Sequence, residues 1–223
     1  MATNYIEHRL LPSLGIFAAL ITIVASIFVL DRPTINYLHD MAIALPWGLV
    51  VPLGILGQPT PYIVVSSFVL LFCGIVYHNT TFSFSEFRIP ARACFIFLAA
   101  MGSWLIAEML KISFGRPRPP LYLAGGIYAF QPFNAATDFA SLPSEHAAVA
   151  SAMAAAFSIL IPAYRSTFFL LAAIIAVSRL LIGLQYPSDI LAGGLVGIIT
   201  VVCLEAMFDR FAIELRHEKR RLR

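Results

Sequence analysis

Charged residues are scarce in this sequence: 12% of its 223 residues are Asp, Glu, Lys or Arg, whereas 60% are hydrophobic and the mean hydropathy is +0.85. A chain with so few polar residues cannot form the polar surface that a water-soluble domain needs, which excludes the soluble globular class. The net charge is only +3, and the basic residues form no stripe. This excludes a nucleic-acid-binding surface. The composition instead predicts a polytopic membrane protein.

Cysteine is also rare. Cys73, Cys94 and Cys203 each lie inside an apolar run and show no metal-ligand spacing, so we interpret them as packing residues and expect neither a disulfide framework nor a metal site. A cleavage signal is missing too. The first apolar run is longer than the core of a signal peptide and lacks a small-residue cleavage site after it, which indicates an uncleaved first span.

Long apolar runs are abundant. A helix needs about 20 mostly apolar residues to cross the hydrocarbon layer. Runs that meet this need lie near residues 10–30, 61–78, 92–111, 144–163, 166–184 and 188–208. The segment 42–57 is shorter and contains Pro46 and Pro52, so we expect it to be interfacial or re-entrant. The pattern predicts one all-α membrane domain over residues 1–223, with six transmembrane helices.

The distribution of cations predicts the orientation. Six spans place both termini on one side, and the tail 209–223 is rich in Arg and Lys. With this topology, ten of the fifteen Lys and Arg residues lie on the side of the termini. The other five are Arg32, Lys111, Arg116, Arg118 and Arg179. Because Lys and Arg concentrate on the cytoplasmic side, we expect cytoplasmic termini and the remaining five cations facing the periplasm or exterior.

Four of these five outward cations fall at the ends of apolar runs, where charge is costly and usually functional. Arg179 and Asp189 alone could form a structural ion pair between helix ends. Three polar clusters at the same side favour an anion site instead. Arg118 and Arg179 can each grip a phosphate bidentately, while Lys111 adds a point charge and Ser144 a hydroxyl donor. Helix-start signals before two of the spans add free backbone N–H groups, which also favour phosphate.

The order and spacing of these residues resemble the type 2 phosphatidic acid phosphatase (PAP2) family, which is related in fold to vanadium haloperoxidases. The motifs of that family are K-x6-R-P, P-S-G-H and S-R-x5-H-x3-D. Lys111–Pro119 fits the first motif, and Pro143–His146 and Ser178–Asp189 fit the second and third except at one place each. The resemblance covers residues 90–205. It implies an integral membrane phosphatase of lipid phosphates, with six spans as in bacterial members and a place in the bacterial inner membrane.

Two departures from the motifs concern the chemistry. The resemblance implies that His146 protonates the leaving oxygen, and that Asp189 orients a nucleophilic histidine four residues earlier. That position is Gln185 here, and an amide cannot attack phosphorus because its nitrogen lone pair is delocalised. The glycine of the second motif is Glu145. This places a carboxylate beside an anion site, so that it turns away, is protonated, or takes part in a different chemistry.

Two functions follow from this pattern. The first is a phosphatase or phosphotransferase acting on a lipid phosphate or diphosphate such as phosphatidate, phosphatidylglycerophosphate, polyprenyl diphosphate or a lipid A phosphate. Without a nucleophile, hydrolysis requires water activated directly by Glu145 or His146. The alternative is a non-catalytic phospholipid-binding or transport-like relative, which Gln185 favours. An engineered Gln185 that traps substrate would leave Glu145 unexplained. The cations already balance the charge of the anion, so we expect no metal or other cofactor.

Overall fold

The computed structural model describes residues 2–41, 52, 54–78, 88–211, 213 and 215, and the side chains of these residues except 2–13, 77, 78 and 88. The described helices are α1 (Ala2–Val29), α2 (Asp31–Asp40), α4 (Thr60–His78), α5 (Arg88–Phe114), α6 (Pro119–Gly125), α7 (Glu145–Leu160), α8 (Arg165–Leu181) and α9 (Pro187–Arg210). Two short 3-10 turns, η1 (Thr137–Phe139) and η2 (Pro162–Tyr164), lie between them. The all-α prediction is confirmed, and each of the six predicted runs lies on a helix.

Three of these helical stretches are long and apolar enough to cross a membrane by length and composition: 89–125, 162–181 and 187–210. The pair α1 and α2 would be a fourth, but it bends by 52° at Leu30. Helices α4 and α7 are apolar and shorter. The count of six spans therefore stays a prediction. Most of the predicted interfacial segment 42–57 lies outside the described residues.

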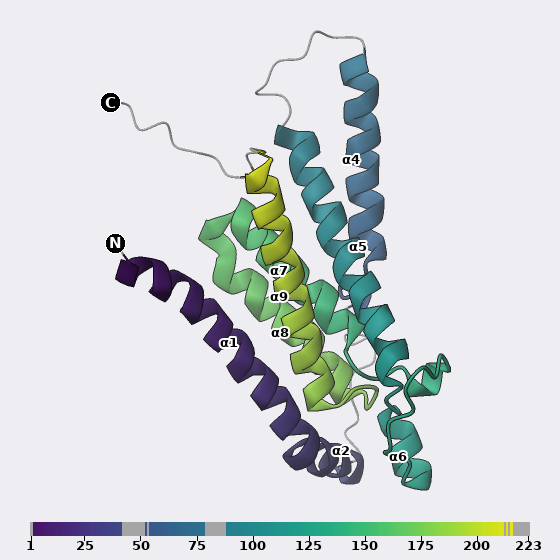
Figure 1. The fold of residues 1–223 in the computed structure, drawn as a ribbon. Helices are drawn as coiled ribbons and strands as arrows, with labels where there is room; N and C mark the ends of the chain where they lie inside the picture. The colour runs from purple at the N-terminus through teal and green to yellow at the C-terminus, as the bar shows by residue number, and fades with distance from the viewer. Residues whose placement is uncertain are drawn as a thin grey trace.

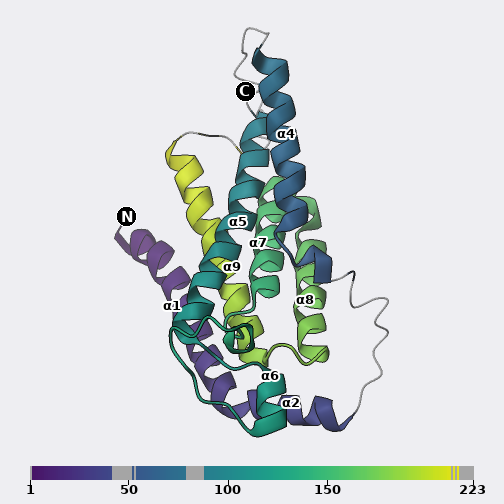
Figure 2. The same cartoon turned by 90° about the vertical axis from the view of Figure 1, so that its right-hand side faces the viewer.

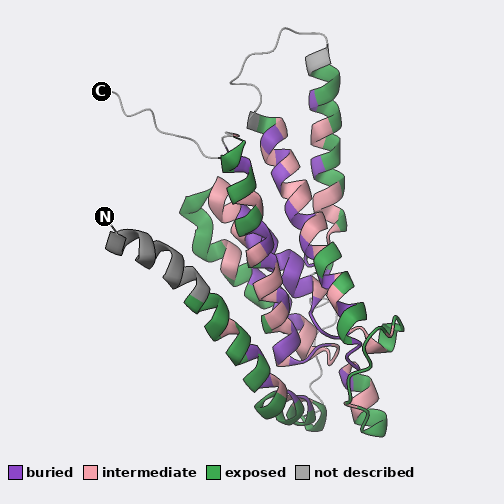
Figure 3. Cartoon of the chain, in the orientation of Figure 1, coloured by how far each residue is buried: buried purple, intermediate pink, exposed green. Residues whose placement is uncertain are grey.

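Outward-facing side chains on this bundle are apolar. Phe28, Phe68 and Met109 are 81%, 70% and 69% exposed, and exposed residues cover the outer faces of the helices while buried ones gather where the helices meet (Figure 3). Exposure of such an apolar surface is unfavourable in water and favourable against lipid tails. The fold is that of a membrane helical bundle.

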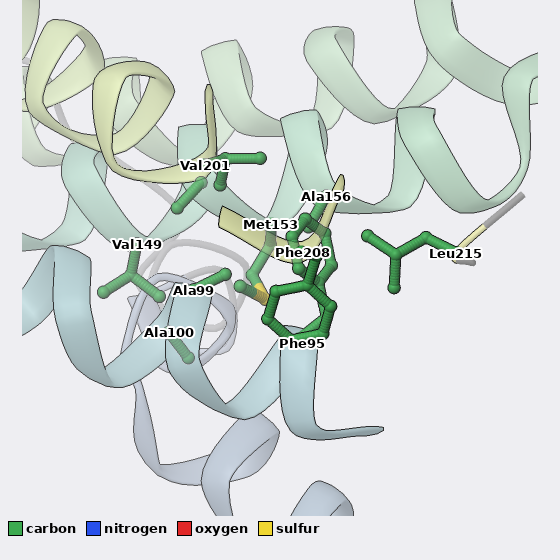
Figure 4. Packing of buried hydrophobic residues seen from close by; sticks show 10 residues of the cluster. Phe95, Ala99, Ala100, Val149, Met153, Ala156, Val201, Phe208 and Leu215 are labelled. Atoms are coloured by element: carbon green, nitrogen blue, oxygen red, sulfur yellow. The ribbon is translucent and has the colours of Figure 1, made fainter. Parts of the chain in front are cut away.

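Helix α7 is the centre of the bundle and packs against α5, α8 and α9 (Figures 1 and 2). Its buried face is largely alanine. The facing side of α9 carries Gly193 and Gly197, a spacing that lets helices approach closely in membranes. Phe95, Phe208 and Met153 fill the core between α5, α7 and α9 (Figure 4).

Gly197→Ala is expected to lower the free energy of unfolding by about 1–3 kcal/mol, because overpacking forces backbones apart. A Cβ at position 197 would lie 2.1 Å from the backbone oxygen of Ala148. The matched control is Gly194→Ala, because a Cβ there meets nothing within 4 Å. Thermal unfolding in detergent should show a loss for the first variant and no loss for the second. Equal stability of the two would contradict this packing.

Candidate phosphate site

One end of the bundle collects the three polar clusters. The last turn of α5 carries Lys111, the first turn of α7 carries Glu145 and His146, the last turn of α8 carries Arg179, and the first turn of α9 carries Asp189. These helix ends lie at the same end of the molecule in both views (Figures 1 and 2). The antiparallel arrangement predicted from the sequence therefore brings the clusters together.

The conformation of the loop after α5 depends on Gly115. Gly115 has φ +56°, and a Cβ there would lie 1.6 Å from the backbone oxygen of Gln131, so only glycine fits. Pro119 then begins α6, with Arg118 as the preceding extended residue. The loop thus turns sharply at the end of α5 and holds Arg118 near Arg179.

Both predicted helix starts are confirmed. The Ser144 hydroxyl oxygen accepts a hydrogen bond from the Ala147 N–H at 3.4 Å and caps α7. Its hydroxyl hydrogen remains able to donate to an anion. The start of α9 is capped by Asp189, which accepts a hydrogen bond from the Tyr186 N–H at 2.8 Å. The Ser144 N–H donates to the Asp189 backbone oxygen at 2.9 Å and joins the two helix starts.

Glu145 points into the cation cluster and does not turn away. Its Oε2 lies 2.6 Å from the Nζ of Lys111, and its Oε1 lies 3.4 Å from Nδ1 of His146. Lys111 is only 3% exposed and also contacts Oε1 of Glu108 at 2.6 Å. One ammonium group is therefore shared by two carboxylates. The sequence reasoning missed Glu108, although its position three residues before Lys111 on the same helix is a typical ion-pair spacing.

Unlike Lys111, Arg118 and Arg179 have no carboxylate partner among the described residues. Both have a buried Nε atom without a hydrogen-bond partner among the described residues, and neither side chain takes part in an ion pair there. Their charged neighbours include each other and, for Arg179, Glu145. Two guanidinium groups with unused donors, held near one another despite their like charge, are a favourable environment for an anion.

The chain that precedes α4 also reaches this end. A Cβ at Gly54 would lie 3.3 Å from Nη1 of Arg179, and one at Gly57 would lie 3.0 Å from the His146 side chain. Glycine at these places lets the backbone lie directly against the two functional side chains. The sequence reasoning assigned no site role to this segment.

Asp189 forms an ion pair with Arg116. Its Oδ1 lies 2.6 Å from Nη1 of Arg116, and its Oδ2 accepts a hydrogen bond from the Ser141 hydroxyl at 2.6 Å. No hydrogen bond joins Asp189 to Gln185 among the described residues. The Gln185 side chain is 5% exposed, and its Oε1 has no partner there. The resemblance implies that Asp189 orients residue 185, but among the described residues no hydrogen bond between the two supports this role.

Arg116 links the site to the first helices. Its second guanidinium nitrogen lies 2.6 Å from Oδ2 of Asp31, and all three side chains, Asp31, Arg116 and Asp189, are fully buried. The same nitrogen donates to the Tyr128 hydroxyl at 3.0 Å. Burial raises the pKa of the Tyr128 hydroxyl above its usual value, so it stays protonated and donates to the Ile27 carbonyl at 2.9 Å.

The sequence reasoning missed Arg116 and Asp31 as members of this network. A signal was available for both, because a charge at the end of an apolar run needs a partner of opposite sign. The part of the chain that the structure describes holds no group of three His, Cys, Asp or Glu side chains able to bind a metal ion.

These features define an integral membrane protein of helical-bundle fold with a cation-lined site at one end. The sequence model of the PAP2 superfamily matches residues 90–212, which is more than half of the chain. The protein belongs to the PAP2 superfamily.

Curated relatives include the lipid A 1-phosphatases of Rhizobium johnstonii and Rhizobium etli, each 37% identical over 99 residues. That stretch is 44% of this chain and 41% and 43% of the two relatives, so it spans about two fifths of their length. Among solved structures, Aquifex aeolicus LpxE gives a TM-score of 0.55 at 22% identity and covers 80% of this chain and 96% of its own. A Bacillus subtilis phosphatidylglycerolphosphate phosphatase gives 0.55 at 18%, with 95% and 98% covered. Both show the same fold.

Proposed function

We propose that this protein is a membrane phosphatase that binds the phosphate of a lipid at the cation-lined end and hydrolyses it. The observation that carries the proposal is the pair of buried guanidinium nitrogens of Arg118 and Arg179 that have no hydrogen-bond partner among the described residues, beside a serine-capped helix start. Such donors stabilise the charge that builds up on a phosphoryl group during transfer. The two rhizobial relatives are named lipid A 1-phosphatase, which makes a lipid A phosphate the first substrate to test, ahead of polyprenyl diphosphate.

The proposed reaction proceeds without a covalent intermediate, because Gln185 cannot attack phosphorus. Glu145 lies 3.4 Å from Nδ1 of His146 and can hold the imidazole so that Nε2 accepts a proton from water. The water oxygen then bonds to phosphorus while the lipid oxygen leaves with the electron pair of the broken P–O bond and takes up a proton from solvent. The imidazolium afterwards returns its proton to solvent. Arg118 and Arg179 stabilise the negative charge on the phosphoryl oxygens.

The test measures phosphate release by the purified native chain from lipid A phosphate, phosphatidate and polyprenyl diphosphate. The assay contains a metal chelator. We expect release from at least one lipid, and about 10²-fold or greater loss in His146→Ala and in Glu145→Gln. Native protein quenched in alkaline denaturant, in which a phosphohistidine survives, should carry no covalently bound phosphate. Undiminished turnover in both variants, or a trapped phosphoenzyme, would overturn this mechanism.

A second candidate is a phospholipid-binding relative without catalysis. Gln185 favours it, because the residue at the nucleophile position cannot form a bond to phosphorus. The same experiment separates the two functions. If the native protein binds these lipids but releases no phosphate from any of them, it is a phospholipid-binding protein without catalysis.

We also propose that both termini are cytoplasmic and that the site faces the periplasm or exterior of a bacterial inner membrane. The ten-to-five division of Lys and Arg between the two sides supports this orientation. Most of the basic tail lies outside the described residues. A cysteine placed at Arg221 should resist a membrane-impermeant thiol reagent in intact cells and react after lysis, with the native chain as the background. Labelling in intact cells would contradict the orientation.

A further inference from the structure

The chain between α6 and α7 presents an aromatic side chain to the outside of the molecule. Phe133 is 81% exposed, as much as Phe28 on α1. Among the described residues it is the only one other than glycine with a positive φ, +65°, and this conformation is strained for a bulky side chain. Such strain persists only where the surrounding structure holds it, and it is typical of functional positions. Both features favour a role outside the protein's own core.

Backbone hydrogen bonds hold this conformation against the end of α5. The Phe133 N–H donates to the Ile112 carbonyl at 2.8 Å. Two residues earlier, the Gln131 N–H donates to the Gly115 carbonyl at 2.8 Å. The Asn134 N–H donates to the Gln131 carbonyl at 3.1 Å and closes a turn around Phe133. The position of Phe133 is therefore set by the backbone, and its ring is left free to contact something else.

The surface at this end of α5 is apolar. Met109 and Ile112 lie three residues apart, and therefore on one face of the helix, and they are 69% and 45% exposed. Helix α5 is part of a stretch long and apolar enough to cross a membrane, so this face contacts lipid. Phe133 is bonded to the same place through Ile112. The partner that fits the exposed ring is therefore the adjoining lipid leaflet.

The segment that carries Phe133 also holds the backbone of Arg118. This return segment, residues 131–141, lies along the loop that follows α5, and the chain between α6 and α7 is drawn beside the lower end of α5 (Figure 1). The Arg118 N–H donates to the Asp138 carbonyl at 2.8 Å. The aromatic side chain and the phosphate-site arginine are thus joined through one hydrogen-bonded segment.

We propose that Phe133 inserts into the lipid leaflet at the cation-lined end, and that the return segment thereby keeps Arg118 at the depth of the lipid phosphates. Insertion removes the apolar surface of the ring from water, which favours the inserted position. The backbone hydrogen bonds then limit how far Arg118 moves towards or away from the membrane. Insertion concerns the membrane alone, whereas the effect on Arg118 rests on the proposed phosphate site.

Fluorescence tests the insertion directly. Phe133→Trp is introduced into the full chain together with Trp47→Phe and Trp104→Phe, so that the new side chain is the only tryptophan. The protein is reconstituted in phosphatidylcholine vesicles with or without bromine on the acyl chains. We expect bromine to quench the emission by about twofold or more, as for an apolar side chain at the boundary of headgroups and acyl chains, and aqueous iodide to quench it weakly.

Met109→Trp in the same background is the control, because this position lies on the exposed face of α5 and should be quenched by the brominated lipid. Emission from the Phe133→Trp variant that iodide quenches strongly, and that brominated lipid leaves unchanged, would overturn the insertion.

Phe133→Asn tests the connection to the site. Asparagine adopts a positive φ more readily than phenylalanine, so the loop keeps its backbone and loses its apolar side chain. The affinity for phosphatidate in nanodiscs of uncharged lipid should fall by about three- to tenfold. The affinity for a short-chain phosphatidate in detergent should stay near the native value, because no leaflet fixes the depth of that ligand. Phe133→Leu keeps an apolar side chain and should restore the affinity in nanodiscs.

Ala135→Asn is the matched control, since it places the same side chain at an exposed position of the same loop and should leave both affinities unchanged. An equal loss in nanodiscs and in detergent, or no loss in either, would overturn the connection between Phe133 and Arg118. Failure of the phosphate site itself gives a different result. The native chain would then bind phosphatidate in neither setting, while brominated lipid would still quench the Phe133→Trp variant.

Discussion

Replacing Arg116 by methionine is expected to lower the free energy of unfolding by about 3–5 kcal/mol, the usual cost of removing one partner from a buried charge cluster. Arg116 lies between the fully buried Asp31 and Asp189, 2.6 Å from an oxygen of each. Without it, two carboxylates face one another in a region closed to water. The loss should also loosen the start of α9, because Asp189 caps that helix.

The measurement is equilibrium unfolding of purified protein in detergent. Arg32→Met is the matched control, since Arg32 is exposed and its guanidinium stacks over the Tyr128 ring at 4.1 Å. A surface contact of this kind contributes about 0.5–1 kcal/mol. A loss in Arg116→Met no larger than that in Arg32→Met would show that the buried cluster contributes little to the fold.

Gln185→His is expected to create or greatly raise phosphatase activity, by about 10²-fold or more, because an imidazole can attack phosphorus where an amide cannot. The Asp189 carboxylate already accepts hydrogen bonds from Arg116, Ser141 and the Tyr186 N–H. A carboxylate has about four acceptor positions, so one remains for an imidazole N–H. Adding Glu145→Gly should raise activity further by removing repulsion from the anion site.

Phosphate release and trapping of an acid-labile phosphohistidine would be followed together in these variants. Gln185→Asn is the control, because it changes the side chain without supplying a nucleophile. If both Gln185→His proteins fold and bind a lipid phosphate but form no phosphoenzyme, position 185 does not reach the bound phosphorus, and the site is not a dormant form of the family's catalytic centre.

The sequence was enough to predict the six long helices because each contains a long, nearly continuous apolar run, whereas the short helices α2 and α6 have no such run. The run 188–208 corresponds to Pro187–Arg210, and the run 166–184 corresponds to Arg165–Leu181. The polar residues at the helix starts also have local causes. Ser144 caps the helix that it precedes, and such a signal acts within a few residues.

The contacts of the site could not be predicted in the same way. Arg116 meets Asp31 across 85 positions of sequence, and no spacing rule connects residues so far apart. The direction of Glu145 was equally open, since a carboxylate in the first turn of a helix is favourable even when it points to solvent. Its position beside Lys111 depends on how α5 packs against α7. Local sequence signals predict the helices, whereas the contacts between charged residues in the site depend on how those helices pack.

The central claim is that Arg118 and Arg179 hold the phosphate of a lipid. The most direct test is the affinity of phosphatidate for the native chain and for Arg118→Ala and Arg179→Ala, with Arg165→Ala at the opposite end of α8 as the control. Each of the two site variants should weaken binding of phosphatidate by about 1.5–3 kcal/mol, the usual contribution of a charge-assisted contact, and the control should match the native chain. Unchanged affinity in both site variants would contradict the account.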